Sequence, residues 1–312
     1  MIYLYPLQQL PLEAVRDFVF NNEIFGVALA ERLEQYTHYL NDKTSSDDKG
    51  KNPGEWIGDF FCLLEDQVLW GVIFVSKPGL VLTCVPQNLP DKVFKEAIPV
   101  IANNFRQRKV YCVSGWSRGA QLVTAALQEK IGGKESSFSR QIIEHRQYLF
   151  MCYDSRRCQG NFPQYPVVQC NTEDLDALYH LQSAYDTVEV LPKNHSFKPE
   201  LCRTNLQRLL QSGTLVAIPS STCDGSGENR QFMAKANVSA LSWRFMLIGG
   251  VYTSDKFRRR GCAARLVQWL GDFAAKNQKQ AVLFVRQENL AARHSYENAG
   301  FFFSGSYEIV YY

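Results

Sequence analysis

A turn rich in arginine and glycine carries the clearest chemistry in this sequence. Residues 258–263 read Arg-Arg-Arg-Gly-Cys-Ala, between an apolar strand-like run at 245–253 and a helical pattern. The start of a helix presents unpaired backbone N–H groups and partial positive charge. Gly261 lets an anion approach the backbone closely, and the three arginines add charge beside it. The turn therefore predicts a site for a pyrophosphate group.

The helix that follows must position this turn. Apolar residues recur at helical spacing through residues 262–276. The stripe consists of Ala263, Leu266, Val267, Leu270, Phe273 and Ala274. By itself, an arginine-rich turn before a helix is also typical of a solvated basic surface, so this turn alone does not identify a binding site.

A second motif follows about thirty residues later in this sequence, at residues 289–301. It reads Asn-Leu-Ala-Ala-Arg-His-Ser-Tyr-Glu-Asn-Ala-Gly-Phe, and we expect a strand at 281–286 before it and a helix at 290–298 within it. Asn289 and Tyr296 are separated by about two helical turns, so they share one face of that helix.

Both motifs carry a family resemblance. Arg258-x-x-Gly261-x-Ala263 resembles the acetyl-CoA motif of the GNAT superfamily, and residues 289–301 are similar to its second signature, N-x-x-A-x-x-x-Y-x-x-x-G-F. The resemblance covers roughly residues 172–312. It implies an N-acetyltransferase domain that uses acetyl-CoA as the acyl donor.

The resemblance also implies roles for single residues. Backbone groups at 251–253 would pair with the pantetheine arm, and amides at 258–263 would hold the pyrophosphate. Asn289 and Ala292 would line the end of a splayed strand, and Tyr296 would lie near the thioester sulfur. The predicted donor-binding set is Val251, Tyr252, Thr253, Arg258, Arg259, Arg260, Gly261, Cys262, Ala263, Asn289 and Ala292.

The chemistry of amide formation agrees with these roles. A neutral amine attacks the thioester carbonyl, and the resulting oxyanion needs a donor, for which a backbone N–H near Val251 is suited. The leaving thiolate needs a proton or a hydrogen bond, which a phenol can supply. We predict Tyr296 as the catalytic residue. The alternative for Tyr296 is packing with Ala292 on the helix face.

The general base is less clear from the sequence. Many members of the family carry a glutamate on the fourth strand, but residues 247–251 hold no carboxylate. Glu189 is the best substitute, with a solvated helix end or a water on a backbone carbonyl as alternatives. Lys235, Asn237 and Trp243 are candidates for the acceptor cleft, with core or surface roles equally open. We expect His294 to be exposed to solvent.

The order of elements predicts an internal duplication. A run of helices, antiparallel strands, helix, strand, helix and strand occurs twice, without evident residue identity between the copies. We predict an α/β (α+β) protein of two tandem GNAT-like domains, with mixed, mostly antiparallel sheets flanked by helices. The domains are residues 1–155 and 170–312, joined by the polar segment between them.

The N-terminal half is predicted to be a degenerate copy without the acetyl-CoA motif. A helix preceded by Pro90 and opened by Asp91 follows the strand-like run at 80–85, and an acidic first turn repels pyrophosphate. Residues 115–119, Gly-Trp-Ser-Arg-Gly, weakly resemble a nucleophile elbow. The favoured interpretation is that Ser117 caps a helix.

Bulk properties narrow the class of protein. The chain has 312 residues, a net charge of +3 and 46% hydrophobic residues, so a chain-wide polyanion partner is not expected. We expect a small-molecule or peptide amine acceptor, and neither nucleic acid nor membrane. The nine cysteines lack the spacing of a disulfide framework or a metal site, which favours a cytoplasmic protein without a metal.

Three alternatives stay open at this point. The missing strand carboxylate suits a CoA-binding sensor without useful catalysis. An aminoacyl-tRNA-dependent transferase can also have two GNAT-like halves, although the modest charge argues against it. The third alternative is transfer of an acyl group longer than acetyl.

Overall fold

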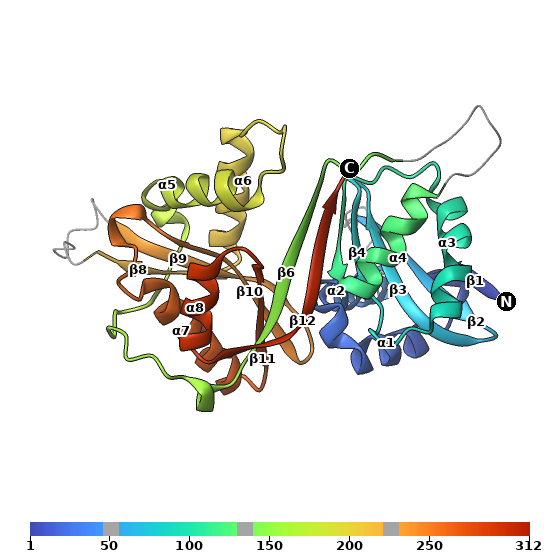
Figure 1. The fold of residues 1–312 in the computed structure, drawn as a ribbon, viewed down its shortest axis with the longest axis horizontal. Helices are drawn as coiled ribbons and strands as arrows, with labels where there is room; N and C mark the ends of the chain where they lie inside the picture. Colours follow the sequence, from blue (N-terminus) through green and yellow to red (C-terminus); the bar gives the residue numbers. More distant parts are fainter. Residues whose placement is uncertain (46–55, 130–139, 221–230) are drawn as a thin grey trace. The chain divides into compact units, whose positions relative to one another are not determined.

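The computed structural model describes residues 1–45, 56–129, 140–220 and 231–312 (Figure 1). The chain forms two compact units, which we describe separately. Unit 1 consists of Met1–Tyr148 with Ser306–Tyr312, and unit 2 consists of Leu149–Gly305. These units differ from the predicted domains at two places, since Ser306–Tyr312 belong with the N-terminal half and residues 149–155 belong to unit 2.

Unit 1 is a sheet with helices on both faces. Its strands lie in the order β1-β2-β3-β4-β5-β12-β6. From β1 to β12 in this order, neighbouring strands are antiparallel except for the parallel pair β4 and β5. Along the chain the elements are β1 (Ile2–Pro6), α1 (Leu12–Asn21), α2 (Val27–Ser45), β2 (Gly58–Glu65), β3 (Val68–Ser76), β4 (Leu80–Cys84), α3 (Asp91–Phe105), β5 (Cys112–Trp116), α4 (Ser117–Gln128) and β6 (Glu144–Tyr153).

The closing strand of unit 1 comes from the other end of the sequence. Residues 307–311 of β12 (Phe301–Tyr311) pair antiparallel with residues 112–116 of β5. Within this segment Val310 is fully buried, and Glu308 accepts a hydrogen bond from Gln121 (2.7 Å) and lies 2.8 Å from a ring nitrogen of His145. The strand is therefore part of the core of unit 1.

Unit 2 repeats the same arrangement. Its strands lie in the order β12-β6-β11-β10-β9-β8-β7, with β10 and β11 parallel. Besides β6 and β12, which contribute to both units, the elements are β7 (Val168–Gln169), α5 (Leu175–Tyr185), a π-helical turn (Asp186–Val190), α6 (Pro199–Gln211), β8 (Leu215–Pro219), β9 (Phe232–Leu241), β10 (Phe245–Thr253), α7 (Cys262–Lys276), β11 (Gln280–Arg286) and α8 (Leu290–Asn298).

Alternating residues of β8 divide the core of unit 2 between two faces of the sheet. Leu215 and Ala217 pack with apolar residues of α5 and α6, whereas Val216 and Ile218 pack with apolar residues of α7. Figure 1 shows α5 beside α6, apart from α7 and α8. The sheet is therefore covered on both sides, and α7 and α8 lie on the same side.

The predicted duplication is confirmed at the level of element order. The series α1-α2-β2-β3-β4-α3-β5-α4-β6 corresponds one to one with α5-α6-β8-β9-β10-α7-β11-α8-β12. In each series the third strand pairs in parallel with the strand that follows the next helix. These pairs are β4 with β5 and β10 with β11. The mixed α/β class with helices flanking mostly antiparallel sheets is likewise confirmed.

Two local predictions were wrong. Ser117 does not cap a helix, because α4 begins at that residue and no side chain caps it. The flanking glycines have a packing reason instead of a catalytic one: a Cβ at Gly115 or Gly119 would lie 2.0 or 2.5 Å from Thr83 Oγ1. In α7, Phe273 is 45% exposed and stacks on Trp269, so it does not belong to the buried stripe.

Within the described residues, no helix is both long and apolar enough to span a bilayer.

Candidate functional site

A cavity of about 630 Å³ in unit 2 is formed by the end of β10, the start of α7, α8 and the π-helical turn. Its lining residues are Val188, Glu189, Val251, Tyr252, Thr253, Phe257, Arg258, Arg259, Gly261, Cys262, Ala263, Asn289, Ala291, Ala292, His294, Ser295 and Tyr296. The two sequence motifs, about thirty residues apart, thus contribute to one site.

The structure brings together the whole predicted donor-binding set except Arg260. The Arg260 guanidinium is outside the cavity lining and lies over the Phe257 ring, 5.4 Å from its centroid. Several lining residues were missed, among them Ala291 and Ser295, which the helical spacing of the second motif could have indicated. His294 is exposed as expected, yet it also contributes to the cavity wall.

The turn before α7 depends on a glycine. Gly261 is the N-cap of α7 with φ +78°, a left-handed conformation that side chains disfavour. A Cβ at this position would also lie 2.9 Å from Cβ of Phe162, behind the turn. No hydrogen bond is found in the described ranges for the first-turn amides of Ala263 and Ala264. Gly261 therefore leaves a helix start open to an anion.

Arg258 is held loosely beside this turn. Its guanidinium lies 2.7 Å from Asp255 Oδ1 and 5.8 Å from the ring centroid of Tyr252. Both charged side chains are more than half exposed, and exposed ion pairs of this kind contribute little stability. The arginine can therefore exchange Asp255 for a phosphate at small cost.

Strands β10 and β11 separate next to the cavity. They pair in parallel from Phe245 with Gln280 to Ile248 with Leu283, and the register ends there. Residues 251–253, which line the cavity, belong to the end of β10 that is not paired with β11. Their backbone groups on the β11 side are thus placed to receive an extended ligand as a further strand would.

A β-bulge lies at the point where the strands separate. On the β9 side, Gly249 pairs with Asn237 and Tyr252 pairs with Lys235, so two residues of β10 stand opposite one residue of β9. Gly250 adopts φ +61° within the bulge. The bulge turns the peptide between Gly250 and Val251 out of the regular ladder, beside the cavity.

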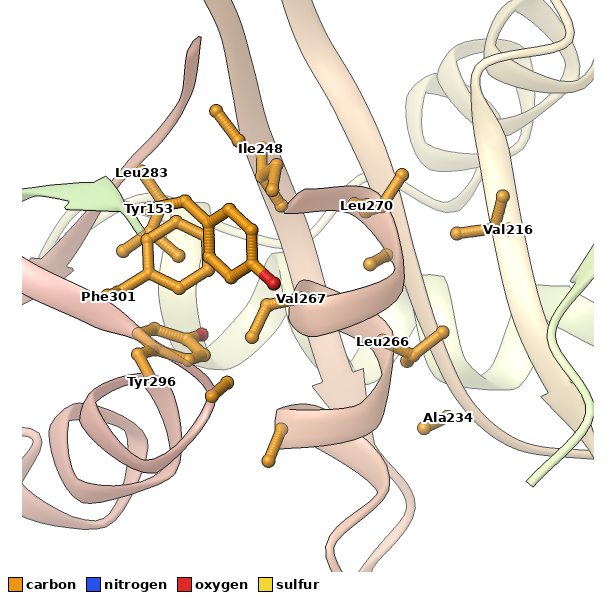
Figure 2. Packing of buried hydrophobic residues seen from close by; sticks show 14 of the residues in the cluster. Tyr153, Val216, Ala234, Ile248, Leu266, Val267, Leu270, Leu283, Tyr296 and Phe301 are labelled. Carbon is orange, nitrogen blue, oxygen red and sulfur yellow. The ribbon is translucent and has the colours of Figure 1, made fainter. Parts of the chain in front are cut away.

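Tyr296 combines contact with the cavity and deep burial. Only 7% of the residue is exposed, and Figure 2 shows its ring among Val267, Phe301 and other apolar side chains of the core. Burial raises the pKa of this phenol above its ordinary value, and the nearby Tyr185 and Glu189 act in the same direction. The hydroxyl therefore stays protonated at neutral pH.

Glu189 lies in the cavity wall, but its carboxylate has a partner. Its Oε2 lies 3.1 Å from Nε of Arg286, and both side chains are mostly buried. Val188 and Glu189 belong to a π-helical turn, a rare geometry that is frequent at functional sites.

The corresponding position of unit 1 differs in chemistry. Helix α3 has Pro90 as its N-cap, and Asp91 in its first turn lies 2.5 Å from the Arg118 guanidinium. Arg118 also donates to the carbonyl of Leu89. A carboxylate and its own ion pair thus occupy the helix start where unit 2 has an open glycine turn.

Comparison with known proteins extends the fold description. The family described as FR47-like protein matches residues 233–308, a span that contains both motifs. Among curated proteins there is no match.

Solved structures resemble the whole chain. An X-ray structure of a Drosophila melanogaster protein has 13% identity and a TM-score of 0.60, covering 100% of this chain and 98% of that one. A GNAT-family acetyltransferase from Colwellia psychrerythraea has 13% identity and a TM-score of 0.51, covering 81% and 85%. A tandem GNAT protein from the clavulanic acid biosynthesis pathway has 9% identity and a TM-score of 0.47, covering 99% and 98%. At these identities the likeness concerns the fold.

Proposed function

We propose that this chain, which has the tandem GNAT fold, transfers an acetyl group from acetyl-CoA to a primary amine, and that unit 2 performs the reaction. The observation that most supports this proposal is that three features meet at one cavity: the Gly261 turn, the end of β10 that is not paired with β11, and the Tyr296 ring.

Acetyl-CoA would bind along this cavity. The amides at the start of α7 hold the pyrophosphate, with Arg258 and Arg259 as charged neighbours. The backbone of residues 251–253 pairs with the amide groups of the pantetheine arm. Asn289 caps α8 by accepting the Ala292 N–H (3.1 Å), which fixes the helix that carries Tyr296.

The transfer step is a direct attack in a ternary complex. The amine nitrogen forms a bond to the thioester carbonyl, and the resulting oxyanion accepts a hydrogen bond from the Val251 N–H at the bulge. The carbon–sulfur bond then breaks, and Tyr296 donates a proton or a hydrogen bond to the leaving thiolate. Cys262 is unsuited as an acyl carrier, because burial raises the pKa of its thiol and keeps it protonated.

The proton of the attacking amine goes to a water or to Glu189. Because Arg286 pairs with Glu189, we favour the water. The acceptor is a small-molecule or peptide amine.

Unit 1 is proposed to be a copy that does not bind acetyl-CoA. The Asp91 carboxylate, with Arg118 as its partner, occupies the start of α3, where the phosphates of a second donor would lie.

The proposal is tested by titrating the chain with acetyl-CoA in a calorimeter and by following release of free CoA with a panel of amines, amino acids, polyamines and aminoglycosides. We expect one donor per chain and turnover with at least one class of amine. Binding without turnover for every class would favour a sensor, and two equivalent sites would contradict the role given to unit 1.

A matched pair of glycine variants locates the site. Gly261→Ala strains the left-handed turn and brings a Cβ against Phe162, so acetyl-CoA binding should be lost. Gly213→Ala imposes the same backbone strain (φ +65°) at a turn outside the cavity and should leave binding intact. Equal loss in both variants would show that the effect is one of stability alone.

A further inference from the structure

We propose that Lys235 is a positioning residue, whose ammonium holds the carbonyl of Gly250 and thereby aims the Val251 N–H at the reacting carbonyl of the donor. The inference rests on the proposed function and goes beyond it, because Lys235 does not line the cavity.

Lys235 is a buried cation in the middle of a strand. It lies on β9 with 0% of its surface exposed, which is unfavourable for a charge unless polar groups meet it. Its Nζ donates to the Gly250 carbonyl at 2.9 Å and lies 4.7 Å from the ring centroid of Tyr185. Asp186 is the nearby opposite charge. A methionine would fill the same space without the cost of burying a charge. The presence of a charged side chain at this position therefore needs an explanation.

The reason lies in the geometry of the bulge. In a trans peptide, the C=O and N–H groups point to opposite sides. Because the Gly250 carbonyl points to Lys235, the N–H of Val251 in the same peptide points away from Lys235, and Val251 lines the cavity. The ammonium thus sets the orientation of the group to which we assign the oxyanion.

The bulge makes such a constraint necessary. The register of β9 and β10 passes from Gly249 directly to Tyr252, so the intervening peptide is outside the regular ladder. A peptide in this position rotates unless something else holds its carbonyl. Gly250 itself is required, because a Cβ there would lie 1.8 Å from Oδ1 of Asn237. Lys235 supplies the hydrogen bond that the ladder does not.

The same lysine also connects the bulge with the π-helical turn, which contributes to the cavity wall. Tyr185 and Asp186 stand at the junction of α5 and the π-helical turn, and that turn carries Val188 and Glu189 into the cavity wall. The position of the proposed oxyanion donor is therefore tied to the position of this wall.

Kinetics of Lys235→Met test the assignment, with Lys279→Met as the matched control. Lys279 also donates to backbone carbonyls next to the β9–β10 hairpin, those of Ser242 (2.7 Å) and Trp243 (2.9 Å), outside the cavity lining. We expect Lys235→Met to lower kcat by about 10²–10³-fold, the usual loss for one oxyanion donor, with Kd for acetyl-CoA within about twofold of the parent. Lys279→Met should keep kcat.

Other outcomes separate the two proposals. Unchanged kcat in folded Lys235→Met, or equal losses in both variants that follow their melting temperatures, would overturn the role of Lys235 and leave the proposed function standing. Absence of turnover by the parent chain with every amine would overturn both. If Lys235→Met does not fold, Lys235→Gln decides, since it removes the charge and its amide nitrogen is one bond too short to reach the Gly250 carbonyl that Nζ meets at 2.9 Å. Full activity of Lys279→Met beside a large kcat loss in Lys235→Gln supports the proposal, and full activity of both rejects it.

Discussion

Nε of Arg286 lies 3.1 Å from Oε2 of Glu189, and the same guanidinium donates to the backbone carbonyls of Val188 (3.2 Å) and Glu189 (2.9 Å). One arginine at the end of β11 thus holds both the carboxylate and the backbone of the π-helical turn. A carboxylate oxygen that already accepts from a guanidinium is poorly placed to take the proton of an attacking amine.

We therefore expect Glu189→Gln to lower kcat by less than about tenfold, well below the 10²–10⁴-fold typical of a lost general base. Arg286→Met should have the larger effect, chiefly on KM, because it releases the turn that forms a wall of the cavity. Steady-state kinetics of the two variants provide the measurement. A loss of several hundredfold in Glu189→Gln, with disappearance of the acidic limb of the pH profile, would instead identify Glu189 as the base.

The second prediction concerns Tyr296. Tyr296→Phe keeps the buried ring and its packing but removes the hydroxyl, so kcat should fall by about 10²–10⁴-fold while the Kd for acetyl-CoA changes little. Calorimetry and kinetics on the same preparation separate the two quantities. Full turnover would mean that solvent protonates the thiolate, and loss of donor binding would make Tyr296 a packing residue.

The third prediction separates the neighbouring arginines. Arg258 and Arg259 line the cavity, whereas Arg260 does not. The double variant Arg258→Glu/Arg259→Glu should weaken acetyl-CoA binding by at least about 1–3 kcal/mol, the range for a lost hydrogen bond to a charged group. Arg260→Glu, with the same change of sign one residue away, should bind nearly as the parent does. Equal weakening of binding in both variants would indicate long-range attraction in place of direct contact. Added salt would then abolish the difference in affinity between each variant and the parent.

Much of this site was accessible from sequence because its parts are local. The glycine turn, the helix after it and the second motif each depend on residues close together in the chain, and their bounds at 262–276 and 290–298 match the structure. The fold class followed from the order of such elements.

The missed features depend on contacts between distant segments. The sequence could not decide whether the Lys235 side chain lies in the acceptor cleft, in the core or at the surface. Its burial depends on contacts with Tyr185 and Gly250, which are distant in the chain. The prediction for Ser117 was wrong by one residue, because α4 begins at Ser117 and Trp116 stands at its N-cap. The pairing of β12 with β5 likewise has no local signal.

A fourth prediction follows from the titration of Lys235. Burial lowers its pKa from 10.5 to about 8, with Asp186 opposing the shift. The unfolded chain therefore binds more protons than the folded one between about pH 8 and the ordinary lysine value, so the free energy of unfolding rises with pH across that window. Between about pH 7.5 and about 9.5, the parent should gain roughly 2 kcal/mol relative to Lys235→Met. Urea unfolding at both pH values measures this, and a constant difference would show that the lysine titrates normally.

The pairing of β12 with β5 has a consequence for how the chain is made. During synthesis, domains generally fold in order from the N-terminus as they emerge. Unit 1 cannot follow that order, because residues 306–312 are translated only after all of unit 2. Until then the edge of β5 that faces β12 is unpaired, although β4 pairs with its other edge, and an unpaired strand edge invites pairing with other chains. A nascent or truncated chain that ends near residue 155 should therefore need protection from aggregation, which pairing with β12 provides once that strand has been made.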